Sequence, residues 1–226
     1  MTTIMITGAG RGIGLELARQ SVAKGWNVIG SVRSVEAQRA LAGALPQMAV
    51  LNFDVTDHKA LENIANAFQR PIDVLINNAG ILNPPSRQST LDMDYDGFAQ
   101  MLNVNVMGPM KVVQVFLPFI REGENPRIIN ISSKMGRMAF SHSDRIAYRA
   151  SKAALNKVTQ AQATDLREDG ITVVAMHPGW VQSDMGGPTA DITPAESASG
   201  ILNVAETLTL DQTGTFIDWD GTSRSW

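Results

Sequence analysis

The chain has no cysteine among its 226 residues. A protein without thiols has no disulfide, no thiolate metal site and no cysteine nucleophile. The absence fits a cytoplasmic protein, and we expect this location. We also expect no bound metal ion.

Long apolar runs and basic blocks are missing as well. The longest apolar run, Val112–Ile120, is short and contains Gln114 and Pro118, so it does not predict a membrane span. The first residues have the pattern of a strand and lack the basic region with which a signal peptide begins, so we do not expect a signal peptide. With a net charge of −3 and no basic block, nothing indicates nucleic-acid binding. We therefore expect small-molecule chemistry, without a nucleic-acid or membrane partner.

Hydrophobic residues make up 44% and charged residues 18% of the sequence, as in ordinary globular proteins. A chain of this length buries one substantial core, so residues 1–226 are predicted to form a single domain.

Short apolar runs typical of strands alternate with segments typical of helices. The expected strands are Thr3–Thr7, Asn27–Val32, Ala49–Phe53, Val74–Asn77, Arg127–Ser132, Thr172–His177 and Thr215–Ile217. The expected helices are Gly12–Lys24, Val35–Ala44, His58–Arg70, Leu91–Arg121, Arg145–Asp169 and Pro194–Ala205. Strands that are apolar throughout predict a parallel sheet covered by helices on both faces. Right-handed crossovers then give a doubly wound, Rossmann-like α/β fold of about seven strands.

One stretch, Ser183–Thr193, is loose in composition, with Gly186, Gly187 and Pro188. It follows a predicted strand and should lie over the carboxyl edge of the sheet, where doubly wound folds bind ligands. We expect a mobile substrate loop here, and a plain connection is the alternative.

A glycine-rich turn, Thr7–Gly14, follows the first predicted strand and opens the first predicted helix. Glycines let the backbone turn sharply and approach a ligand, and a helix N-terminus presents free N–H groups to an anion. The order of strand, glycine turn and helix is the context that dinucleotide binding requires. The turn therefore predicts a pyrophosphate site, and a purely structural turn is the alternative.

The second predicted strand indicates which dinucleotide is bound. An acid at its end would accept a hydrogen bond from the 2′-hydroxyl of NAD, but this strand ends in Val32 and Arg33. Arg11 lies inside the glycine turn. Guanidinium groups pair well with phosphate oxygens, so the two arginines favour NADP(H) over NAD(H). Two solvated surface arginines are the alternative.

Tyr148 and Lys152 stand four residues apart in an alanine-rich segment without Gly or Pro. On a helix such residues share one face. An ammonium about 4 Å from a phenol, at an effective dielectric of about 20, favours the phenolate by roughly 4 kcal/mol. The pair therefore predicts an acid whose pKa is tuned towards neutrality, although the spacing alone is common on solvated helices.

Several motifs together resemble one family. They are Thr7-Gly-x-x-x-Gly12-x-Gly14, Asn77-Asn78-Ala79-Gly80, Asn105, Ser133, Tyr148-x-x-x-Lys152 and Pro178-Gly179. In this order they resemble the short-chain dehydrogenase/reductases over nearly the whole chain. The segment from His177 to Pro188 and the final Gly214–Gly221 segment are similar to the C-factor-like branch, which is related to sniffer-type carbonyl reductases.

The resemblance implies which residues contact the cofactor. The pyrophosphate and the 2′-phosphate would meet the glycine turn and its neighbours, namely Gly8, Gly10, Arg11, Gly12, Ile13, Gly14 and Arg33. The adenosine and the nicotinamide would meet Asp54, Val55, Asn77, Ala79, Gly80, Tyr148, Lys152, Pro178, Gly179, Val181 and Ser183.

It also implies the catalytic residues. Tyr148 would be the acid/base, Lys152 would bridge to the nicotinamide ribose, and Ser133 would orient the substrate. Asn105 would mark a helix distortion that holds a proton-relay water. Asn103 and Ser132 compete with Asn105 and Ser133; we choose the latter pair because their spacing from neighbouring motifs resembles that of the family.

The implied activity is hydride transfer between a nicotinamide and a carbonyl or secondary alcohol. A non-catalytic dinucleotide-binding protein, acting in signalling or redox sensing, is the alternative. The resemblance also implies a homodimer or homotetramer, because the family commonly uses the helices expected at Leu91–Arg121 and Arg145–Asp169 for a two-fold interface. A monomer, with the apolar positions of these helices in the core, is the alternative. An extended loop, Met138–Arg145, should lie beside the site. We expect its His142, Asp144 and Arg145 to form a solvated face, and contact with the substrate is the alternative.

Overall fold

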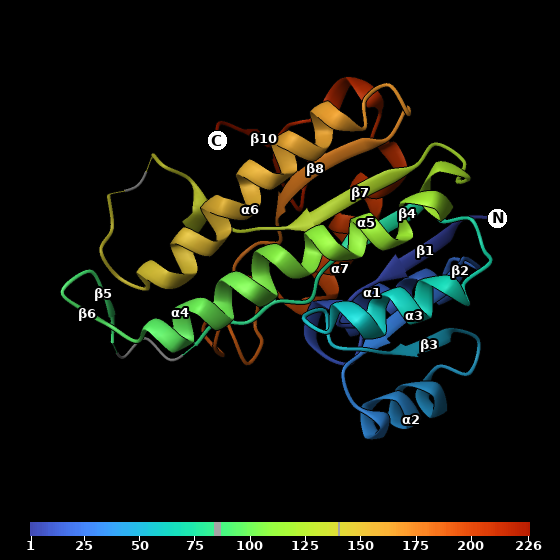
Figure 1. Cartoon of the computed structure of the whole chain (residues 1–226), viewed down its shortest axis with the longest axis horizontal. Coiled ribbons are helices and arrows are strands. Elements are labelled where there is room, and N and C mark those ends of the chain that lie inside the picture. The colour runs from blue at the N-terminus through green and yellow to red at the C-terminus, as the bar shows by residue number, and fades with distance from the viewer. Residues whose placement is uncertain (84–86, 140) are drawn as a thin grey trace.

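The computed structural model describes residues 1–83, 87–139 and 141–226, and its centre is an eight-stranded sheet in the order β10-β9-β8-β7-β4-β1-β2-β3. The predicted strands form at β1 (Thr3–Ile6), β2 (Asn27–Val32), β3 (Ala49–Asn52), β4 (Val74–Asn77), β7 (Arg127–Ile131), β8 (Thr172–His177) and β9 (Phe216–Asp218). These seven strands run parallel to their neighbours. The doubly wound α/β fold is confirmed (Figure 1).

The eighth strand is a correction to the predicted count and to the all-parallel sheet. β10 (Ser223–Arg224) pairs antiparallel with β9 at the edge. It contains two polar residues, so it has no apolar run that would reveal it in the sequence. It is instead placed by a turn at Gly221, whose φ of 87° favours glycine.

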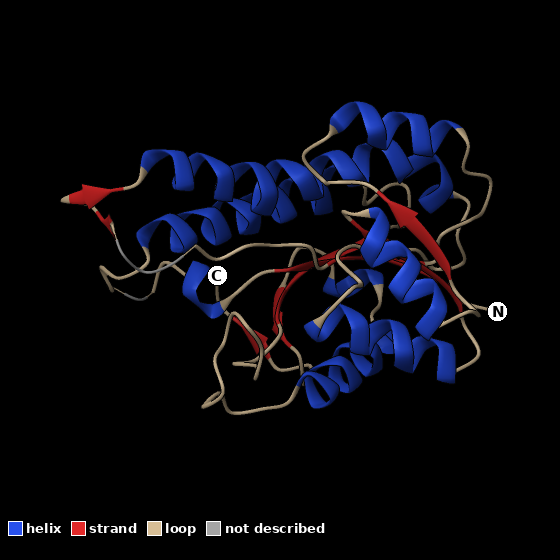
Figure 2. Cartoon of the chain, turned by 90° about the horizontal axis from the view of Figure 1, so that it is seen from below, coloured by secondary structure: helices blue, strands red, loops and turns tan. Residues whose placement is uncertain are grey.

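Helices cover the sheet in two layers (Figure 2). On one face, α1 (Gly12–Ala23), α2 (Val35–Ala44) and α7 (Pro194–Thr207) pack on apolar side chains of β1, β2, β4, β7 and β8. On the other, α3 (His58–Asn66), α5 (Gly108–Arg121) and α6 (Ile146–Asp165) cover a second core. The strands are thus buried from both sides, which explains their uninterrupted apolar character.

The predicted helix Leu91–Arg121 is wrong at its start and in its middle. A two-stranded hairpin, β5 (Gln88–Ser89) and β6 (Asp92–Met93), comes first. The helix α4 (Tyr95–Leu102) begins only after Asp94, whose carboxylate accepts a hydrogen bond from the Gly97 N–H and caps it. A π-helical turn, η1 (Asn103–Met107), then separates α4 from α5.

Two other predicted helices extend too far at their C-terminal ends. α3 ends at Asn66 and α6 at Asp165 rather than at Arg70 and Asp169. After α6 the chain forms a turn over residues 166–170, and after α3 a turn residue, Ala67, is followed by irregular chain. Two short 3-10 turns, η2 (Lys134–Gly136) and η3 (Leu210–Gln212), complete the fold.

Candidate active site

The predicted site residues meet at the carboxyl edge of the sheet, around β1, β4, β7 and β8. β1 lies between β2 and β4, so the chain changes direction across the sheet at this point. In doubly wound folds, the loops on either side of such a switch point form the ligand crevice.

The glycine turn between β1 and α1 has the backbone shape of a phosphate-binding loop. Gly8 and Gly12 have φ values of 70° and 54°, which side chains resist. A Cβ at Gly14 would overlap the Gly8 carbonyl oxygen and lie 2.6 Å from Asn78 Nδ2. α1 begins after Arg11 without a side-chain cap, so its first N–H groups remain free for an anion. The turn therefore fits a dinucleotide pyrophosphate.

Asn78 and Thr7 hold this turn against β4. The Asn78 side-chain amide donates to the carbonyl oxygens of Thr7 (3.0 Å) and Gly8 (3.2 Å). The Thr7 hydroxyl accepts hydrogen bonds from the backbone N–H groups of Asn78 and Ala79. Asn78 is a residue whose role the sequence analysis did not assign, although the Asn-Asn pair was visible.

Arg11 and Arg33 occupy different environments. Arg11 forms an exposed ion pair of 2.5 Å with Asp184, in the loop Ser183–Thr193. Arg33 is exposed just beyond β2, and within residues 1–83, 87–139 and 141–226 it makes no ion pair. Exposed pairs contribute little stability, so a phosphate could compete for Arg11.

The expected adenosine contacts lie beside β3 and β4. Asp54 Oδ1 accepts hydrogen bonds from the N–H and the hydroxyl of Thr56, and Val55 is buried against Gly108. Asn77 is buried in the sheet, where its amide donates to Asn130 Oδ1 at 2.9 Å. Asn77 therefore supports the sheet centre.

Tyr148 stands on the first turn of α6, and only 7% of it is exposed. Burial raises its pKa to about 12, and a hydrogen bond with Ser133 and the charge of Arg145 lower the pKa in part. The expected lowering by Lys152 is wrong for this structure, because desolvation of the phenolate outweighs the nearby charges.

Lys152 lies one turn further along α6 and is also buried. Its Nζ donates to the carbonyl oxygen of Ile131 at 2.8 Å and lies 5.7 Å from the centre of the Tyr148 ring. Burial lowers the pKa of Lys152 to about 8. The amine is thus held beside the phenol by the end of β7.

The two serines after β7 point to different partners. Ser132 Oγ donates to Asn156 Oδ1 at 2.5 Å, inside the protein. Ser133 caps the η2 turn, accepting a hydrogen bond from the Met135 N–H at 3.1 Å, and its hydroxyl also meets Tyr148. The structure therefore brings Ser133, and not Ser132, to the phenol.

Asn105 lies in the π-helical turn and is fully buried. Its side chain accepts a hydrogen bond from the Ile81 N–H at 2.8 Å and donates to the Ile81 carbonyl and to Ser151 Oγ, both at 3.0 Å. A Cβ at Gly80 would lie 3.3 Å from Asn105 Oδ1 and 3.7 Å from Lys152 Nζ. Gly80 thus leaves a polar space between Asn105 and Lys152.

The segment after β8 is more regular than its sequence suggested. Gly179 has a φ of 88°, and Val181 is buried and forms a parallel bridge with Ile192. Pro178 accepts a hydrogen bond from the Ser197 hydroxyl on α7.

Ser183 stabilises the turn that begins the loop Ser183–Thr193. Its hydroxyl accepts from the Gly186 N–H at 3.2 Å, and its carbonyl accepts from the Gly187 N–H at 2.8 Å. Met185, on this turn, receives a hydrogen bond from the Tyr148 hydroxyl, with an O–S distance of 3.9 Å. No sequence pattern predicts this contact beyond the expected position of the loop.

His177, the last residue of β8, is a buried imidazole that the sequence analysis did not assign. Its Nδ1 has no hydrogen-bond partner in the part of the chain that the structure describes. Burial lowers its pKa from 6.5 to about 4, opposed by the Asp218 carboxylate and assisted by the charges of Lys134 and Arg224.

We predict that His177 makes the protein less stable in acid. Between pH 6.5 and about 4, His177 is protonated in the unfolded chain but neutral in the folded chain. The free energy of unfolding therefore falls by about 3 kcal/mol as the pH drops through this range. Urea unfolding at several pH values should show a shallower slope for His177→Gln. The exposed His58→Gln control should keep the wild-type slope, and a His177→Gln slope equal to wild type would contradict the prediction.

The sequence model described as "short chain dehydrogenase" matches residues 2–192. The chain belongs to this family. It is therefore an oxidoreductase of the short-chain dehydrogenase/reductase type, whose members bind a nicotinamide dinucleotide and act on small molecules. The predicted family membership is confirmed.

Individual relatives place the chain in the carbonyl-reductase/sniffer type. It is 40% identical over 162 residues to the C-signal of Myxococcus xanthus, covering 71% of this chain and 96% of that protein. Carbonyl reductase Sniffer of D. melanogaster has a similar structure, with a TM-score of 0.93, 28% identity and full coverage of both chains. An NADPH-bound carbonyl reductase from chicken fatty liver follows with a TM-score of 0.91, 31% identity and coverage of 100% and 99%.

In the described residues no helix is long and apolar enough to cross a membrane. Residues 1–83, 87–139 and 141–226 also contain no group of three or more histidine, cysteine, aspartate or glutamate side chains arranged to hold a metal ion.

Proposed function

We propose that this short-chain dehydrogenase/reductase reduces a carbonyl compound with NADPH, with Tyr148 as the proton donor. The observation that carries the proposal is the buried Tyr148 hydroxyl. The Tyr148 hydroxyl forms a hydrogen bond with Ser133, and Tyr148 lies one helical turn before Lys152. It is close to the crevice between the glycine turn and the substrate loop, which are joined by the Arg11–Asp184 ion pair, and it contacts Met185 of that loop.

The proposed roles of Tyr148 and Ser133 follow from the protonation state of Tyr148. With a pKa of about 12 the phenol is protonated near neutral pH, so it is ready to give a proton rather than to accept one. When bound, the nicotinamide cofactor supplies the hydride. Tyr148 donates its proton to the oxygen that becomes an alkoxide, and Ser133 donates a hydrogen bond to the same oxygen. Such interactions strengthen as negative charge develops in the transition state.

Lys152 and Asn105 then restore the proton. A phenolate left after transfer is stabilised by the Lys152 ammonium beside it. The polar space between Asn105, Lys152 and Gly80 leads from this pair towards the π-helical turn. We propose that a water held there by Asn105 carries the proton back to Tyr148.

The cofactor preference is a separate proposal, supported by Arg11 and Arg33 and by the NADPH-bound relative. Loss of Arg33, which is free of ion pairs in the described residues, should weaken NADPH binding about tenfold and leave NADH binding nearly unchanged, because only NADPH carries the 2′-phosphate. Fluorescence titration of wild type and Arg33→Ala with both cofactors measures this. Equal affinities of the wild type for NADPH and NADH would contradict the preference.

Assembly and location remain proposals as well. We propose a homodimer or homotetramer that uses the exposed face of η1 and α5, where Met107 and Met110 are exposed, and a cytoplasmic location.

A panel of aldehydes and ketones, monitored by the loss of NADPH absorbance, tests the proposed function. Turnover of at least one compound is expected. Tight NADPH binding without turnover of any compound would instead favour the alternative of a dinucleotide-binding protein in signalling or redox sensing.

A further inference from the structure

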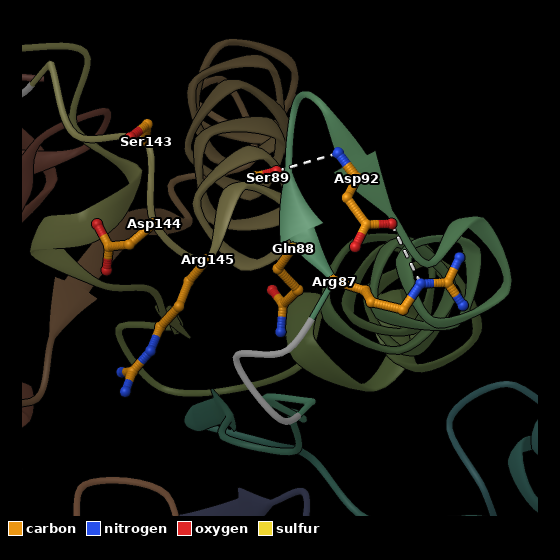
Figure 3. Close-up of a pocket in the computed structure, with 7 residues that line it drawn as sticks. All are labelled: Arg87, Gln88, Ser89, Asp92, Ser143, Asp144 and Arg145. Atoms are coloured by element: carbon orange, nitrogen blue, oxygen red, sulfur yellow. Dashed lines mark hydrogen bonds and ion pairs between the residues drawn. The ribbon is translucent and has the colours of Figure 1, made fainter.

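Two segments that are distant in the sequence meet in front of α6. The hairpin β5–β6 and the loop that precedes α6 line a cavity of about 380 Å³ (Figure 3). Every lining residue is polar or charged. The charged ones are Arg87, Asp92, Asp144 and Arg145. A cavity of this kind suits a polar group of a ligand better than an apolar one.

The two arginines and two aspartates of the lining have equal and opposite charges, but both carboxylates already have cationic partners. Asp92 pairs with Arg87 at 3.2 Å, and Asp144 pairs with Arg149 at 2.7 Å, so both carboxylates are already neutralised. The backbone carbonyl of Arg145 accepts a hydrogen bond from the Arg149 N–H, but its guanidinium makes no hydrogen bond or ion pair within the described ranges. Figure 3 shows its guanidinium apart from both carboxylates. One positive charge in the cavity is therefore left without a partner.

The conformation and the position of Arg145 are both energetically unfavourable. Its backbone is left-handed, with φ of 50°, which is unfavourable for a residue with a long side chain. It also stands at the N-terminus of α6, where the helix dipole disfavours a cation and no side chain caps the free N–H groups. No contact of the guanidinium compensates for the backbone strain or for the unfavourable helix dipole. Residues that are strained without such compensation are expected at functional sites.

Arg145 is also near the reacting group. It precedes Tyr148 by three residues, about one helical turn. Burial raises the pKa of Tyr148, and the charge of Arg145 is one of the two influences that lower it, so the guanidinium lies within electrostatic reach of the hydroxyl. Arg145 therefore belongs both to the lining of the cavity and to the electrostatic surroundings of the Tyr148 hydroxyl.

We propose that the cavity binds an anionic group of the substrate and that Arg145 pairs with it. The substrates would be aldehydes or ketones that carry a carboxylate or a phosphate. A guanidinium recognises either group with paired hydrogen bonds, and the free N–H groups of α6 add to the attraction. This inference rests on the proposed function, because it names the substrate class of the same site.

A matched pair of substrates tests the proposal. 4-Carboxybenzaldehyde and its neutral methyl ester, methyl 4-formylbenzoate, differ in charge but present the same aldehyde. Arg145→Gln should lower the ratio of kcat/KM for the acid to that for the ester by about tenfold or more, mainly through KM for the acid. Arg145→Lys should retain part of this ratio. Arg19→Gln, an equal change in net charge on the distant surface of α1, should leave the ratio unchanged.

A second readout does not depend on turnover. Calorimetric titration of the NADPH complex with benzoate, and separately with inorganic phosphate, should show binding of at least one anion by wild type and a loss of about tenfold or more in Arg145→Gln. The two titrations also distinguish a carboxylate from a phosphate site. Anion binding without reduction of any aldehyde would reject the proposed function and keep the anion site.

The proposal would be overturned by an unchanged acid-to-ester ratio in Arg145→Gln. Equal losses for both substrates would also overturn it, since they would mean that Arg145 acts only on Tyr148 or on the fold. If wild type reduces no aldehyde, the anion titrations decide the matter. Failure of wild type to bind either benzoate or phosphate would then overturn the proposal.

Discussion

Tyr148→Phe is expected to lower kcat/KM for any reducible carbonyl about a thousandfold, because general acid catalysis contributes roughly this factor. The substitution removes one buried oxygen, which in this structure meets Ser133 and Met185. Since the ring remains, the packing of α6 should be preserved. Initial rates of NADPH oxidation at saturating cofactor measure the loss.

The second tyrosine of the chain provides a matched control. Tyr95 is 77% exposed at the start of α4, so Tyr95→Phe deletes the same atom without touching the site. Its activity should equal that of wild type. NADPH should still bind to Tyr148→Phe with a dissociation constant close to that of wild type. Substantial turnover by Tyr148→Phe would show that the phenol is not the proton donor.

Gly14→Ala is expected to destabilise the protein by about 3 kcal/mol and to abolish dinucleotide binding, because the added methyl group overlaps the Gly8 carbonyl. The clash is with the backbone of the glycine turn and with the Asn78 amide that holds it. No side-chain rotation relieves it, so the turn must move. Chemical denaturation and NADPH titration measure the two effects.

Gly43→Ala is the matched control for this substitution. A Cβ at Gly43, within α2, would meet nothing within 4 Å. The same change should therefore stabilise the protein by roughly 0.5–1 kcal/mol, as expected for glycine in a helix interior. A Gly14→Ala variant as stable as wild type that still binds NADPH would contradict the account of the turn.

The sequence predicted the parallel strands and most helices because each has a strong local signal. β4 and β8 are short apolar runs, and α1 follows a glycine turn. The break inside Leu91–Arg121 lacks such a signal, since Asn103–Met107 is compatible with an ordinary helix. The π-helical turn is held by tertiary contacts, above all those between Asn105 and Ile81.

The site likewise combines residues that have a local sequence signal with contacts that depend on the tertiary structure. Tyr148 and Lys152 are predicted from their spacing together with the motifs around them, and the structure buries both side chains. The direction of the Tyr148 pKa was not predictable, because it depends on burial rather than on the distance to Lys152. The contact with Met185 and the cavity beside Arg145 join segments that are far apart in the sequence, so no local pattern reveals them.

Transfer of deuterium from NADPH that carries deuterium at both positions of nicotinamide C4 tests the central claim most directly. Wild type should deliver the label to the former carbonyl carbon of the product, as seen by mass spectrometry and NMR. Tyr148→Phe should deliver almost none over the same time, although it binds the cofactor. The absence of label in every product of wild type, or undiminished transfer by Tyr148→Phe, would contradict hydride transfer with Tyr148 as the proton donor.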